Sequence, residues 1–205
     1  MRYIIVVILF GLGSPLFAQS GFADTVKEYY RVDPFYGTFS SFVNALSQDS
    51  ALLDKQIKKQ TDTTGYYLRG HYNVFNPFSV NASKVDLLFY ESVAKAGDKA
   101  VFSFYTYQLT AYFADTELYR KKIRNDYKKL LRKLRKDWYY TEVQSLAGYE
   151  NVEDGELTSF SNNDNRRSIP PATVSWQTLS KTKHLALTFI VRLKQEQNYA
   201  FPVSY

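Results

Sequence analysis

The segment from Tyr119 to Trp138 has the clearest helical periodicity in the chain, and it limits what the rest can fold into. At the rotation of about 100° per residue in an α-helix, its apolar residues fall within an arc of about 120°. These residues are Tyr119, Ile123, Tyr127, Leu130, Leu131, Leu134 and Trp138. Asp115, Thr116 and Glu117 supply a cap and acidic charge at the helix start, which suits the helix dipole. The pattern predicts an amphipathic helix whose apolar arc packs on another layer.

The opposite side of this helix is almost entirely basic. The segment contains ten Lys and Arg residues and two Asp residues. Nine of the cations form a basic arc, namely Lys121, Lys122, Arg124, Lys128, Lys129, Arg132, Lys133, Arg135 and Lys136. Neighbouring like charges at i,i+4 spacing cost about 0.2–0.5 kcal/mol each when exposed. A solvated helix face usually mixes acids with bases, so we interpret the basic arc as a candidate contact surface for an anionic partner. A merely solvated face is the alternative.

Charge is segregated along the chain. Residues 120–136 contain ten basic residues and one acidic residue, a net charge of +9, whereas the whole chain carries +6. The remainder is therefore net negative. The expected partners are an acidic protein, lipid headgroups or an envelope polysaccharide. Nucleic acid is not expected, because a secreted protein rarely meets it and the basic arc has no aromatic residues for base stacking. Insertion of the apolar arc into a membrane surface is a further alternative.

Residues 1–18 have the pattern of a secretory signal peptide. A short basic start precedes the apolar run Ile4–Phe10, and Leu16-Phe17-Ala18 is a plausible cleavage sequence. A retained membrane anchor is the alternative, but this run is shorter than the 20 or so residues that span a bilayer. We therefore expect cleavage after Ala18, no transmembrane helix after signal removal, and a single domain over residues 19–205. The expected location is the bacterial envelope, either periplasmic or associated with the outer membrane.

The remaining periodic segments predict one more helix and several strands. Asp33-Pro34 is a helix-start signal, and apolar residues at helical spacing predict a helix over residues 33–48. Residues 51–60 fit either a helix or an edge strand. Alternation of apolar and polar residues predicts strands over residues 66–74, 84–93, 99–113, 173–179 and 184–194. The short turn Ala96-Gly97-Asp98 joins the second and third of these strands in a β-hairpin.

These segments together define the expected fold class. It is α+β, with a mainly antiparallel sheet of about five to six strands packed against one long basic amphipathic helix and a shorter N-terminal helix. The 18 Tyr and 15 Phe residues suit a β-rich chain. Residues 148–171 are polar and contain Pro170-Pro171, which predicts a loop. Within it, Glu150, Glu153, Asp154 and Glu156 are interpreted as a solvated acidic cluster.

The sequence carries little that points to catalysis. The chain has no cysteine, which excludes disulfides, thiolate catalysis and cysteine metal sites. Its two histidines, His71 and His184, are interpreted as ordinary strand residues. We predict no catalytic residue, no metal site and no cofactor.

The predicted function is a non-enzymatic binding or structural protein of the envelope, with helix 119–138 as its possible contact surface. One alternative is a small-ligand-binding protein or a weakly marked hydrolase. Another is an outer-membrane barrel component, because Tyr199, Phe201, Val203 and Tyr205 alternate to an aromatic C-terminus.

Overall fold

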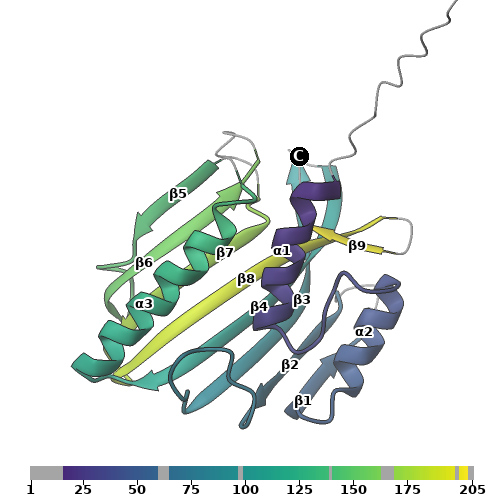
Figure 1. Ribbon diagram of the computed structural model, residues 1–205. Coiled ribbons are helices and arrows are strands. Elements are labelled where there is room, and N and C mark those ends of the chain that lie inside the picture. Colours follow the sequence, from purple (N-terminus) through teal and green to yellow (C-terminus); the bar gives the residue numbers. More distant parts are fainter. Residues whose placement is uncertain are drawn as a thin grey trace, which may run out of the picture.

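The computed structural model describes residues 16–59, 65–96, 99–138, 140–162, 169–196 and 199–202 (Figure 1). Within them, nine strands form one antiparallel sheet in the order β1-β2-β3-β4-β8-β7-β6-β5, and β9 pairs with β8. The helices are α1 (Leu16–Tyr29), α2 (Phe39–Gln48) and α3 (Glu117–Leu134). The strands are β1 (Leu53–Lys58), β2 (Tyr67–Tyr72), β3 (Lys84–Ala96), β4 (Lys99–Ala114), β5 (Tyr140–Ser145), β6 (Val152–Ser161), β7 (Ala172–Leu179), β8 (His184–Glu196) and β9 (Tyr199–Pro202).

The α+β class and the antiparallel sheet are confirmed, but the expected number of strands is wrong. The β-hairpin is formed by β3 and β4, whose pairing runs to Ala96↔Lys99. Residues 51–60 contribute the edge strand β1. The segment predicted to be a loop over residues 148–171 instead contains β6, which pairs with β7 from Val152 to Phe160 and with β5 from Glu156 to Ser161. β5 and β6 were not predicted as strands, because their side chains are mostly polar and β5 is exposed throughout.

All three helices lie on one face of the sheet (Figure 1). On this face Phe42 of α2 meets Phe89 at a ring distance of 5.5 Å, and Tyr29 of α1 meets Phe189 at 5.9 Å. α3 contacts β7, β8 and α1. None of the helices among the described residues combines the length and apolar character that crossing a bilayer requires. We call the covered side the helix side of the sheet.

The two shorter helices differ from the prediction at their starts. α2 begins at Phe39 instead of near Pro34, because Thr38 is its N-cap and accepts from Ser41 N at 3.1 Å. Asp33 instead accepts from Phe35 N at 2.9 Å, which makes a local turn. α1 was not predicted as a helix. Its first three residues belong to the expected signal peptide, and the rest of that segment, residues 1–15, lies outside the described residues.

The core is tied to the centre of the sheet by Tyr30, directly after α1. This side chain is buried, and its hydroxyl lies 2.9 Å from Tyr107 O on β4 and 2.6 Å from Phe189 O on β8. Its ring centroid lies 4.2 Å from that of Tyr107, with the two ring planes tilted by 35°. The hydroxyl has one proton to share between carbonyls of two adjacent central strands, and this contact fixes the end of α1 above them.

Replacing Tyr30 by Phe should lower the free energy of unfolding by about 1–3 kcal/mol, because the buried hydrogen bond from its hydroxyl to the sheet carbonyls is lost. Chemical denaturation of the purified chain measures this change. Tyr36→Phe is the matched control, because Tyr36 is 81% exposed and its loss should change stability by less than about 0.5 kcal/mol. Equal stability of the Tyr30 variant and the control would show that the Tyr30 hydroxyl contributes nothing to the free energy of unfolding.

Candidate anion-binding groove

The long basic helix is confirmed as α3. Thr116 caps it by accepting from Tyr119 N at 3.2 Å, and Arg120 forms an ion pair with Asp115 at 2.5 Å. Its apolar arc is buried against the sheet through Ile123, Tyr127, Leu130, Leu131 and Leu134. The helix ends at Leu134, one turn before the predicted Trp138, although Trp138 remains buried. The apolar arc is therefore occupied by core packing.

The structure places the nine cations of the basic arc at the surface, with Lys133 half-buried and the other eight exposed. Two of the nine are paired. Arg124 contacts Asp154 at 2.7 Å and lies 4.3 Å above the ring of Trp176. Lys133 pairs with Glu28 of α1. The other seven cations form no ion pair with any residue that the structure describes; they are Lys121, Lys122, Lys128, Lys129, Arg132, Arg135 and Lys136.

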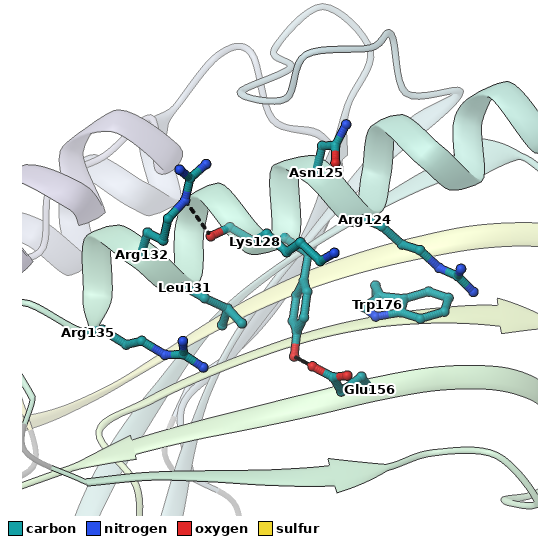
Figure 2. Close-up of a pocket in the computed structure, with 9 residues that line it drawn as sticks. Arg124, Asn125, Lys128, Leu131, Arg132, Arg135, Glu156 and Trp176 are labelled. Atoms are coloured by element: carbon teal, nitrogen blue, oxygen red, sulfur yellow. Dashed lines mark hydrogen bonds between the residues drawn. The ribbon is translucent and has the colours of Figure 1, made fainter.

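A groove of about 650 Å³ runs between α3 and strands β6 and β7 (Figure 2). It is lined by Arg124, Asn125, Tyr127, Lys128, Leu131, Arg132, Arg135, Glu156 and Trp176. Figure 2 shows Arg124 stacked on Trp176 at one end and Arg135 reaching toward the strands at the other, with Lys128 between them. Arg132 turns back and donates to Lys128 O at 3.4 Å.

Tyr127 forms the floor of the groove. Its hydroxyl donates to Glu156 Oε1 at 2.8 Å and lies 2.6 Å from the hydroxyl oxygen of the buried Thr158. Burial, more than the neighbouring Glu156, raises the pKa of Tyr127 well above its usual value. Among the described residues that line the groove, Glu156 is the one acid, whereas four are cations. Even with Arg124 neutralised by Asp154, the groove keeps an excess of positive charge.

The acidic cluster predicted over residues 150–156 is not simply a solvated loop. Asp154 and Glu156 lie two residues apart on β6 and therefore on the same face of that strand. Both contact α3, Asp154 through Arg124 and Glu156 through Tyr127. Glu150 remains exposed, 3.8 Å from Lys181. Sequence analysis did not predict the contacts of Asp154 and Glu156 with α3, because it did not recognise β6, and it missed Glu28 because it did not recognise α1. It predicted the strand of Trp176 but not its place beside α3, which depends on how the helix packs on the sheet.

Asp126 is the acidic exception at the edge of the basic arc. It is buried and accepts from Ser79 N at 2.9 Å and from the Ser79 hydroxyl at 2.7 Å. Ser79 belongs to the segment between β2 and β3. Asp126 therefore anchors that segment to α3 and does not neutralise the basic arc.

The two histidines lie away from the groove. His71 is on β2, with its Nδ1 3.5 Å from Asp54 Oδ2, and it lines a second groove of about 480 Å³ on the uncovered side of the sheet. His184 begins β8. Across the part of the chain that the structure describes, no three His, Asp or Glu side chains gather as they would around a metal ion.

Comparison with protein-family models, with curated proteins and with solved structures gives no match for this chain. The functional interpretation therefore depends on the geometry of the molecule alone.

Buried tyrosines make stability depend on alkaline pH. Burial raises the pKa of Tyr29 to about 12, and it raises the pKa of Tyr30 and Tyr107 well above the usual value. Above about pH 10 the unfolded chain loses these phenolic protons while the folded chain keeps them. The unfolded state then binds fewer protons, so the free energy of unfolding falls as pH rises.

Chemical denaturation between about pH 9 and pH 12 measures this effect. The contribution of the buried tyrosines to the free energy of unfolding should be constant below about pH 10 and should fall above it. Tyr29→Phe should have a shallower loss than the parent chain, because it removes one group whose pKa differs between the two states. Identical pH profiles for the two chains would show that the pKa of Tyr29 is not raised in the folded state.

Proposed function

We propose that this chain is a non-enzymatic binding protein of the bacterial envelope, periplasmic or outer-membrane-associated, and that α3 binds an anionic partner. The observation that carries the proposal is the set of seven exposed cations on α3 without an ion pair among the described residues. Several of them border a groove next to Trp176.

The energetics of α3 support a binding role over simple solvation. Arg124, Lys128, Arg132 and Lys136 follow one another at i,i+4 spacing, so each exposed contact between like charges costs about 0.2–0.5 kcal/mol. Among the described residues, neighbouring elements supply acids to two positions of the basic arc, through Asp154 and Glu28. A bound anionic partner would offset the remaining repulsion and would be attracted over about 10 Å at moderate salt.

The shape of the site favours an elongated partner. Arg124 and Arg135 are eleven residues apart on α3, which corresponds to about 16 Å along the helix axis. A chain with repeated negative charges, such as an acidic polypeptide or an envelope polysaccharide, could contact several cations over that length. Lipid headgroups are the alternative ligand of the charged surface. Insertion of the helix into a bilayer would require Leu130 and Leu134, and both are fully buried in the core.

The test is binding of the purified chain to poly-glutamate, to a polyuronate and to phosphatidylglycerol vesicles over a salt series. We expect binding to at least one of them, weakening as salt rises. Lys128→Glu with Arg132→Glu should weaken that binding by about tenfold or more, because each exposed pair contributes about 0.2–1 kcal/mol and reversal adds repulsion.

The matched control is Lys58→Glu with Lys181→Glu, which changes the net charge equally at exposed positions outside α3. This variant should bind within about twofold of the parent chain. The proposal is wrong if the parent chain binds none of the probes at low salt, or if the two double variants lose binding equally.

A further inference from the structure

The two outer edges of the sheet are built differently. β1 is irregular: its pairing with β2 shifts between Leu53 and Gln56, and Asp54 has a φ of 49°. β1 also carries Lys55 and Lys58. Bulges and lysines are devices by which proteins block the addition of another strand. The edge at β1 is therefore protected.

The edge at β5 has none of these devices. Its pairing with β6 runs without a shift from Tyr140↔Ser161 to Ser145↔Glu156. Its sequence, YTEVQS, contains no lysine and no proline, and all six residues are exposed. Among the described residues, no strand lies on its outer side. β5 therefore offers a regular, unprotected edge.

The register shows which backbone groups this edge offers. Leu146 N donates to Gly155 O at 2.9 Å, immediately after the last β5 pair. Because hydrogen-bonded and non-hydrogen-bonded positions alternate in an antiparallel pair, Gln144, Glu142 and Tyr140 direct their N–H groups toward β6. The N–H and C=O groups of Thr141, Val143 and Ser145 then point outward from the sheet.

The outward-bonding residues also lie on the helix side of the sheet. Val143 pairs with Thr158, and Ser145 pairs with Glu156, and both of these β6 residues contact Tyr127. Val143 is 53% exposed. β5 therefore lies next to the β6 residues that contact Tyr127, although none of its own residues lines the groove. A further strand would lie about 5 Å beyond β5, with every second side chain on the helix side.

We propose that β5 accepts an extended acidic segment of a partner polypeptide as an additional strand, with its acidic side chains on the helix side, facing the cations of α3. This inference depends on the proposed function, because it specifies the partner of the same cationic surface. A polypeptide is required by the outward N–H and C=O groups, which a polysaccharide or a lipid could not pair in a ladder.

Charge favours such a partner over a second copy of this chain. The helix-side residues of β5 are Thr141, Val143 and Ser145, none of which is acidic. Pairing two copies through β5 would therefore bring no negative charge to Lys128 and Arg135. The acid of β5, Glu142, lies on the opposite face, where it does not repel the acidic residues of an added strand.

The probe is a soluble peptide of about eight residues with Glu at alternate positions and Thr between them. Binding to the full chain is measured together with hydrogen exchange of the Thr141, Val143 and Ser145 amides. We expect these three amides to become protected on binding. In an antiparallel ladder the Glu residues would lie opposite Thr141, Val143 and Ser145 and direct their N–H groups toward β5. The same peptide N-methylated at each Glu keeps its charge but cannot form this ladder, and it should bind about tenfold more weakly or worse.

Val143→Pro tests whether the outward N–H group of Val143 forms a hydrogen bond to the added strand. It removes an outward N–H without removing a bond to β6, so folding should be retained while peptide affinity falls about tenfold or more. Val143→Thr keeps the N–H and is the matched control, with an affinity within about threefold of the parent chain. If Val143→Pro fails to fold, the N-methylated peptide still decides the question on the parent chain.

Strand addition is overturned if Val143→Pro and the N-methylated peptide bind as well as their parents, or if the three amides are not protected. It is equally overturned if the chain self-associates through β5 and the peptide does not compete.

The proposed function can fail separately. Loss of poly-glutamate binding in Lys128→Glu with Arg132→Glu, but not in Val143→Pro, would support the cationic surface and reject the strand. Retention of poly-glutamate binding in both would reject the cationic surface itself.

Discussion

The wide sheet has one apolar face, and the burial of that face determines the arrangement of everything else. α1, α2 and α3 cover it side by side, with Tyr30 fixed to carbonyls of the two central strands β4 and β8. α3 covers the part formed by β7 and β8. Because its apolar arc must face those strands, its opposite side must face water. The basic arc is exposed as a direct consequence of core packing.

Core packing explains where the cations lie, but it does not explain their sign or number. A helix of the same shape could carry mixed charges outward at lower electrostatic cost. Near α3, the acids of neighbouring elements serve specific contacts: Asp154 holds Arg124 over Trp176, and Glu28 holds Lys133. Asp126 anchors Ser79. These contacts attach the helix to its surroundings, and they leave the excess positive charge beside the groove.

Elements with a strong buried periodicity could be predicted from the sequence. α3 and the β3–β4 hairpin were found because their apolar residues recur with a clear period, and β7 and β8 were found for the same reason. β5 has no buried face, so no alternation marks it. The polar residues around Gly155 made β6 resemble a loop, although its pairing partners impose a strand. The cationic residues of the site were therefore predictable, whereas the groove was not, because its other wall is made by β6 and β7.

Lysine acetylation footprinting of the full chain, with and without bound poly-glutamate, tests the central claim most directly. The account predicts that Lys121, Lys122, Lys128 and Lys129 of α3 become less reactive when the polymer is bound. Lys58 on β1 and Lys181 beside Glu150 should keep their reactivity, since both lie outside α3. Unchanged reactivity along α3, or protection confined to Lys58 and Lys181, would show that the basic arc is a solvated surface and that any binding occurs elsewhere.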